Sequence, residues 1–168
     1  MPDKRHFAPV ADTGTRVLIL GSLPGEASLR AAQYYAHPQN GFWRLVGGVI
    51  GRDLAALPYE ARLAALRETG VGLWDVVASA RRSGSLDSAI RDVEQADLKG
   101  LIATLPDLRA VGFNGGTAAR IGRRILGQGD GPALIDLPSS SPAHTMPLER
   151  KAESWAVLSA YLSQSGVR

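Results

Sequence analysis

The stretch "VLILGSLPG", Val17 to Gly25, decides the fold. Its first four residues are aliphatic, and the run stops at Gly21. A short apolar run that ends at glycine and proline is typical of a strand buried in a sheet. The turn that follows combines the backbone freedom of glycine with the stiffness of proline, so it can shape the floor of a pocket. It lacks the glycine-lysine-Ser/Thr ending of a phosphate-binding P-loop.

Three further apolar runs have the same character: "VGLWDVV" (71–77), "RAVGFNG" (109–115) and "ALIDLPS" (133–139). Apolar residues at helical spacing lie between them, and a last helix is predicted over 148–162 with Thr145 as its N-cap. Strands that alternate with helices need crossover connections, so the chain predicts a mostly parallel sheet covered on both faces. In such sheets ligands bind beyond the carboxyl ends of the strands.

The composition limits the classes of protein that fit. With 168 residues and 45% hydrophobic composition, the chain predicts one domain spanning residues 1–168. It has no cysteine, which excludes disulfides, thiolate nucleophiles and cysteine-ligated zinc or iron–sulfur sites. No segment approaches the roughly 20 apolar residues that span a bilayer, so a soluble cytoplasmic protein is expected.

The charge balance is mildly basic. Nineteen Lys and Arg against 16 Asp and Glu give a formal net charge of +3, which hints at a polyanionic partner. Arg120, Arg123 and Arg124 share one face of a predicted helix, and Arg81 with Arg82 forms a second basic pair. The alternative is a solvated helix face, which is the commoner role of such charges.

The segment "QYYAHPQNGFW", Gln33 to Trp43, gathers four aromatic residues in a chain that is 6% aromatic. Asn40 lies just after the proline, where its side chain can cap the exposed amides of a helix start. Alternatively, Asn40 presents its amide carbonyl to a water molecule or a substrate. An amide is a poor general base, but it can orient a water when the leaving group departs early.

Two later strand ends also carry polar side chains. In "GFNGG", Asn114 offers a donor beside an acceptor, which matches the lactam edge of uracil or hypoxanthine, although a turn asparagine in a left-handed conformation fits equally well. In "LPSSSPAHT", hydroxyls, backbone amides and a following helix start favour a phosphate site, although serine-rich loops are common. No nucleophile elbow surrounds these serines, which disfavours Ser-His catalysis.

Together and in this order, these segments resemble the uracil-DNA glycosylase superfamily, in its hypoxanthine-DNA (deoxyinosine) glycosylase branch, sometimes called family 6. The resemblance covers Val17 to Trp155 and is most specific over residues 17–43. It implies an α/β fold, a three-layer α-β-α sandwich with a small central, mostly parallel four-stranded sheet. It also implies that a deaminated base is flipped out of DNA and that its N-glycosidic bond is hydrolysed without metal or cofactor.

The resemblance also implies roles for individual residues. Asn40 matches the asparagine after "HP" in that branch and is the expected catalytic residue, because Leu23 and Pro24 stand where other branches carry a catalytic Asp or Asn. The expected base-binding residues are Gly21, Ser22, Leu23, Tyr35, His37, Phe42 and Asn114. The expected contacts with DNA phosphates are Ser139, Ser140, Ser141 and His144, where His144 replaces an asparagine of relatives.

The expected partner is therefore DNA that contains deaminated bases. The protein is expected to act as a monomer on nucleoid DNA in the cytoplasm. Neither a membrane nor a metal cluster is expected as a partner. Two alternatives stay open at this point. A uracil-specific enzyme fits because uracil and hypoxanthine share the lactam edge. A non-catalytic DNA- or nucleotide-binding module on the same fold fits as well. The sequence does not decide between single- and double-stranded DNA, nor which residue wedges into the base stack.

Overall fold

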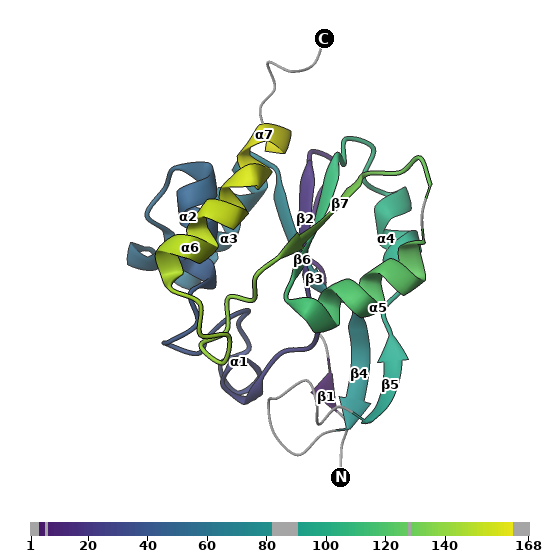
Figure 1. Ribbon diagram of the computed structural model, residues 1–168, viewed down its shortest axis with the longest axis horizontal. Helices are drawn as coiled ribbons and strands as arrows, with labels where there is room; N and C mark the ends of the chain where they lie inside the picture. The colour runs from purple at the N-terminus through teal and green to yellow at the C-terminus, as the bar shows by residue number, and fades with distance from the viewer. Residues whose placement is uncertain (1–3, 6, 82–90, 128, 163–168) are drawn as a thin grey trace.

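A four-stranded parallel sheet lies at the centre of the protein (Figure 1). The computed structural model describes residues 4, 5, 7–81, 91–127 and 129–162, with the side chains of 7–77, 96–127 and 129–162. The sheet consists of β2 (Val17–Gly21), β3 (Val71–Asp75), β6 (Ala110–Asn114) and β7 (Ala133–Leu137), in the order β3-β2-β6-β7. All three pairings are parallel. Each of the four apolar runs contains one of these strands, as predicted.

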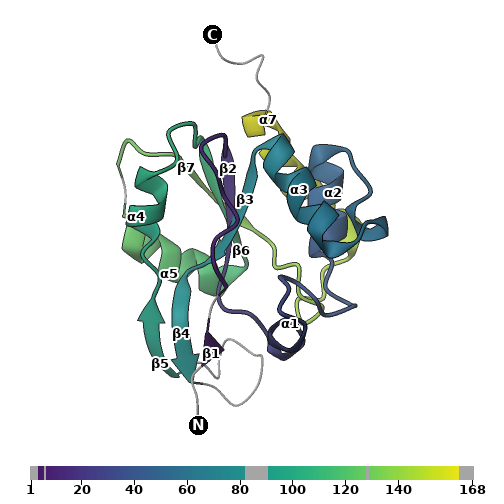
Figure 2. The same cartoon turned by 180° about the vertical axis from the view of Figure 1, so that it is seen from behind.

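Helices cover both faces of this sheet, which gives the three predicted layers. Val17 and Ile19 face α2 (Phe42–Ile50), α3 (Tyr59–Thr69), α6 (Leu148–Trp155) and the following turns, because they share one buried cluster with residues of those elements. Leu18 and Leu20 face α4 (Leu98–Ala103) and α5 (Gly116–Leu126) in a second cluster. Figures 1 and 2 show these two groups of helices on opposite sides of the sheet.

A second, antiparallel sheet was not predicted. It consists of β1 (Lys4–Arg5), β4 (Val77–Arg81) and β5 (Arg91–Gln95) in the order β1-β4-β5. The run "VGLWDVV" was expected to be one strand, but it divides at Val76 between β3 and β4. Val76 and Val77 donate backbone hydrogen bonds to the carbonyls of Gly21 and Ser22, so the chain turns across the end of β2.

The remaining helical elements are short. α1 (Glu26–Ala31) follows β2, and a 3-10 turn, η1 (Leu54–Ala56), joins α2 to α3. The predicted closing helix is interrupted, because the 3-10 turn η3 (Ala156–Leu158) separates α6 from α7 (Ser159–Leu162). Thr145 is not its N-cap: α6 begins after Pro147, and no side chain caps it. No helix in the described part of the chain is long and apolar enough to cross a membrane.

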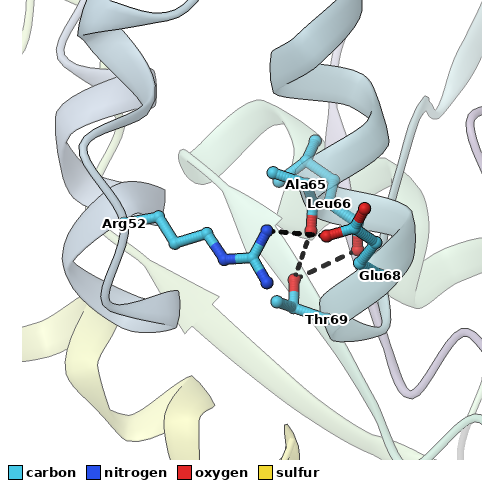
Figure 3. A network of polar contacts seen from close by, with 5 residues as sticks. All are labelled: Arg52, Ala65, Leu66, Glu68 and Thr69. Carbon is cyan, nitrogen blue, oxygen red and sulfur yellow. Dashed lines mark hydrogen bonds and ion pairs between the residues drawn. The ribbon is translucent and has the colours of Figure 1, made fainter.

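Polar contacts at the end of α3 fix it against the α2–η1 connection (Figure 3). Arg52 Nη1 lies 2.8 Å from Glu68 Oε1, and the Thr69 hydroxyl donates to the Ala65 and Leu66 carbonyls one turn earlier. The Arg52 and Glu68 side chains are 44% and 63% exposed, so this ion pair contributes at most about 1 kcal/mol. The buried clusters, not such surface pairs, therefore hold the layers together.

Two helical glycines test the packing of the layers. A Cβ added at Gly122 of α5 would collide with the Phe113 ring, whereas a Cβ added at Gly48 of α2 would meet nothing within 4 Å. Gly122→Ala should lower the free energy of unfolding by about 1–3 kcal/mol through overpacking. Gly48→Ala should raise it by about 0.5–1 kcal/mol, because alanine is the better helix former. Urea unfolding of both variants measures this, and equal effects would contradict the described packing.

Candidate active site

A cavity of about 510 Å³ opens at the carboxyl ends of the parallel strands. Figure 1 shows α1 and the segment that leads into α6 at this end of the sheet. Pockets for small ligands usually measure about 300–1,000 Å³, so this one can take a purine or a pyrimidine base. The residues that line it are 21–28, Tyr34, Tyr35, His37, Asn40, Asp75, Asn114 and 139–144. The structure thus brings every predicted site residue except Phe42 to one cavity.

Gly21 lines the cavity at a place where two side chains approach its backbone closely. A Cβ added there would lie 2.9 Å from both Asp75 Oδ1 and the Tyr35 hydroxyl. Glycine at the end of β2 therefore allows a carboxylate from β3 and a phenol from the α1–α2 segment to approach the same backbone. Ser22 and Leu23 continue the wall beyond it.

Of the two aromatic residues predicted to bind the base, Tyr35 lines the cavity. It has a φ of 53°, which is uncommon for a tyrosine and requires support from neighbouring contacts. Its ring stacks on Phe42 with centroids 3.9 Å apart and an interplanar angle of 11°. Phe42 is completely buried and does not line the cavity. Its predicted contact with a base is therefore wrong, because Phe42 lies behind Tyr35 and supports it.

The turn before α2 fixes the side chains of Asn40 and His37. Asn40 Oδ1 accepts a hydrogen bond from the Phe42 amide at 2.9 Å, so the predicted capping of the helix start is confirmed. The Phe42 N–H can donate to the oxygen of the Asn40 side-chain amide but not to its nitrogen, so this bond also fixes the orientation of that side-chain amide. His37 Nδ1 accepts from the Gln39 amide at 3.1 Å, so the proton of the neutral ring is on Nε2. Both side chains line the cavity.

Asn114 and Ser140 form a reciprocal pair of hydrogen bonds. The Ser140 amide donates to Asn114 Oδ1 at 2.8 Å, and Asn114 Nδ2 donates to Ser140 Oγ at 2.9 Å. Asn114 Nδ2 also lies 3.4 Å from the Tyr35 hydroxyl, a long contact. Asn114 has a negative φ and ends β6, so it is not a left-handed turn residue. The Ser140 N–H can donate only to the oxygen of the Asn114 side-chain amide, which fixes the orientation of that amide. Asn114 also lines the cavity.

The three serines of the loop after β7 differ in their exposure. Ser140 is 2% exposed, and its carbonyl accepts from the Gly41 amide at 3.0 Å. Its amide, its carbonyl and its hydroxyl oxygen all bond within the protein, and its phosphate contact stays a prediction. Ser139 and Ser141 are partly exposed, and their hydroxyl oxygens accept from the amides of Ser141 and Ala143. His144 is exposed at the cavity rim.

The lining residues that were not predicted include Asp75 and Tyr34. Asp75 is the last residue of the buried strand β3, and the rule that places ligands at strand ends would have singled it out. Tyr34 is buried, and its hydroxyl donates to the Ala8 carbonyl at 2.9 Å. Burial first, and the nearby Asp75 charge second, raise the pKa of Tyr34 well above its usual range. Tyr34 is therefore a neutral donor at every physiological pH.

The predicted basic cluster on α5 is not part of the cavity lining. Arg123 pairs with Asp136 at 2.9 Å and lies over the Phe113 ring, so it is not free to bind a partner without breaking these contacts. Arg120 and Arg124 are exposed on α5. Arg82 and the side chain of Arg81 lie outside the described residues. Among the described residues no group of three His, Asp or Glu side chains could hold a metal ion.

Comparison with known proteins places the chain in a family. Residues 8–162 match the uracil DNA glycosylase superfamily. The chain belongs to this superfamily. Two relatives in the superfamily, from Methanosarcina barkeri and Methanosarcina acetivorans, are named hypoxanthine DNA glycosylase and are 41% and 43% identical to this chain. The alignments cover 91% and 90% of this chain and 96% and 95% of the relatives.

A solved structure of the superfamily supports the fold. The solution NMR structure of a Methanosarcina acetivorans protein, described provisionally as a uracil DNA glycosylase, is 41% identical and matches with a TM-score of 0.85. The match covers 96% of this chain and 99% of that chain. The resemblance seen in the sequence and the predicted three-layer fold are therefore confirmed.

Gly21 allows a test of the cavity wall. Gly21→Ala should lower the free energy of unfolding by about 1–3 kcal/mol, because the new methyl group meets Tyr35 and Asp75. Tyr35→Phe removes one of the two colliding atoms, so the double variant should recover part of that loss. A double-mutant cycle by urea unfolding measures the coupling, and additivity within about 0.5 kcal/mol would contradict the described wall.

Proposed function

We propose that this protein is a hypoxanthine DNA glycosylase that releases the deaminated base from deoxyinosine in DNA and leaves an abasic site. One observation carries the proposal: in a chain of this superfamily, a single cavity brings together an oriented Asn40, an oriented Asn114 and the ring of Tyr35. The relatives named hypoxanthine DNA glycosylase support the choice of base.

The reaction breaks the bond between C1′ of the sugar and N9 of the base, and water supplies the hydroxyl that C1′ gains. The electron pair of the broken bond goes to the base, which leaves as an anion and takes up a proton. The site must therefore stabilise negative charge on the base and deliver water to a sugar that becomes positive. Before this step the nucleotide must leave the base stack, at a cost of a few kcal/mol that is least for a mispaired base.

Recognition of the flipped base falls to Tyr35 and Asn114. The base stacks against Tyr35, which lines the cavity and whose ring is supported by Phe42. Asn114 Oδ1 keeps a second lone pair for the N1–H that deamination of adenine creates, while its Nδ2 meets the base carbonyl. One Nδ2 hydrogen donates to Ser140 Oγ, and the other faces the Tyr35 hydroxyl, which lies 3.4 Å from Nδ2. A hydrogen bond of that length is weak, so a base carbonyl can replace the Tyr35 hydroxyl at little cost.

Stabilisation of the leaving base falls to neutral donors. His37 offers its Nε2–H to the cavity because the Gln39 amide occupies Nδ1. A donor aimed at the developing negative charge lowers the barrier more than one that binds the neutral base equally well. Ser22 and the amides of the Gly21–Gly25 turn lie on the same wall and complete the contact with the base.

Asn40 holds the attacking water. One lone pair of its Oδ1 accepts from the Phe42 amide, and the second can accept from a water at the sugar. An amide cannot take the proton, so the mechanism depends on early departure of the base, which the donors around it promote. Loss of this group removes the water position without removing the contacts that bind DNA.

The strand is held at the cavity rim. The hydroxyl oxygens of Ser139 and Ser141 accept backbone amides, which leaves their protons for phosphate oxygens, and His144 adds a further donor. All of these groups come from one chain, so we infer that a monomer suffices. We also infer that the whole chain forms one domain and acts on nucleoid DNA in the cytoplasm.

Uracil is the second candidate base. The N–H and adjoining carbonyl of its lactam edge match Asn114 as those of hypoxanthine do, and a cavity of about 510 Å³ does not exclude the smaller ring. A duplex with a single uracil, assayed beside one with a single deoxyinosine, separates the two. A non-catalytic binding module would bind both and release neither.

Asn40→Ala tests the proposal. The variant should release hypoxanthine about 10²–10³-fold more slowly under single turnover, because a transition-state contact is lost. It should lose about 1 kcal/mol of stability with its helix cap and should bind a duplex carrying a stable abasic analogue as tightly as the parent. Gln39→Ala, an exposed neighbour in the same turn, is the matched control and should cleave normally. Equal rates for Asn40→Ala and the parent would refute the role of Asn40.

A further inference from the structure

Lys151 of α6 is a buried cation outside the cavity lining. The residue is 4% exposed, and its Nζ donates a hydrogen bond to the Ser141 carbonyl at 3.1 Å. No ion pair of Lys151 with a carboxylate is found in the part of the chain that the structure describes. Burial lowers the pKa of Lys151, because desolvation disfavours its charged form. The proposed reaction gives this cation no role.

Such a lysine does little for the stability of the fold. A buried charge that meets only a neutral carbonyl loses more in desolvation than the single hydrogen bond returns. An apolar side chain of similar length would fill the same space without that cost. The contribution of Lys151 must therefore be sought in the segment that it holds.

Lys151 and Trp155 hold the two ends of that segment. They are four residues apart, so they lie on one face of α6. The Trp155 indole N–H donates to the Pro138 carbonyl at 2.9 Å, and Lys151 holds the Ser141 carbonyl. Between these two points, Ser140 is bonded to Asn114 and Gly41. Three of the four residues of segment 138–141, namely Pro138, Ser140 and Ser141, are thus held by hydrogen bonds to the rest of the protein.

The outer side of the same segment carries the hydroxyls of Ser139 and Ser141. Each hydroxyl oxygen accepts a backbone amide at 3.1 Å, which fixes its place and leaves its O–H available to donate. The place of the Ser141 hydroxyl depends on the backbone after Ser141, whose carbonyl Lys151 helps to hold. The His144 amide also donates to this carbonyl at 3.0 Å, so loss of the Lys151 bond leaves the Ser141 carbonyl with one donor instead of two. The loop is then held less firmly, and so is the Ala143 amide that donates to the Ser141 hydroxyl.

We propose that Lys151 is the positioning residue of the DNA-phosphate contact, which it maintains by holding the Ser141 carbonyl from behind the loop. This rests on the proposed function, because it takes the Ser139–Ser141 loop as the part that meets the DNA backbone. A cation beneath the loop also adds positive potential at a rim whose described lining carries no lysine or arginine. The role is therefore in the binding of DNA and not in the release of the base.

Lys151→Met tests this, because methionine keeps the length and apolar contacts of the lysine stem and removes the donor and the charge. The variant should melt at the parent's temperature or above it. Its dissociation constant for a duplex with a stable abasic analogue should rise about tenfold or more, as expected for loss of a hydrogen bond to a charged group. The single-turnover rate at saturating deoxyinosine duplex should stay within about threefold of the parent, because the cavity groups are untouched.

Leu158→Val is the matched control, because Leu158 is buried in the turn that follows α6 and forms no bond to the loop. It should melt lower than the parent and bind the duplex normally. Unchanged DNA affinity of Lys151→Met would overturn the proposal, and so would a Lys151→Met variant that is less stable than the parent. A parent protein that binds the analogue duplex but releases no base would refute the proposed function alone, since the binding comparison would still stand.

Discussion

The hydrogen bonds of Ser140 hold the site together. Its amide and hydroxyl pair with the Asn114 side chain at the end of β6, and its carbonyl accepts from Gly41 at the start of α2. Three segments far apart in the sequence therefore meet at one residue that is 2% exposed. A buried polar group left unpaired costs about 1–3 kcal/mol, so these bonds favour one arrangement strongly over its neighbours. The two asparagines that the proposed reaction needs are fixed relative to each other as a result.

The same arrangement explains how a site built from weak chemical groups can work. Neither amide is an acid or a base, so each can act only through its position, and each is oriented by a backbone N–H that permits one direction of the amide. Tyr35 has a backbone conformation that tyrosine disfavours, and Phe42 supports its ring from behind. Phe42 and Ser140 are buried, whereas the groups to which the proposed reaction assigns the flipped base and its phosphates line the cavity.

The sequence predicts the parallel sheet and most of the cavity because both follow from local patterns. Apolar runs that end at glycine mark the strands, and polar residues after those runs must meet at one edge of the sheet. The break at Val76 was missed because Val76 and Val77 are apolar and buried, so they continue the apolar run beyond Asp75. Phe42 was given the wrong role because residue type does not reveal which side of a turn faces the ligand. That depends on the Tyr35 stack and on the bonds to Asn114, which join residues distant in the sequence.

The most direct test of the shared cavity is an NMR titration that follows the side-chain amide signals of Asn40 and Asn114. The protein is titrated with a duplex that carries one 2′-fluoro-deoxyinosine, whose glycosidic bond resists hydrolysis, and with the matching duplex that carries deoxyadenosine. Both amide signals should shift with the deoxyinosine analogue at the same molar ratio, and neither should shift to that extent with deoxyadenosine. An Asn114 signal that responds while Asn40 stays unchanged would contradict a cavity in which both residues contact the flipped nucleotide.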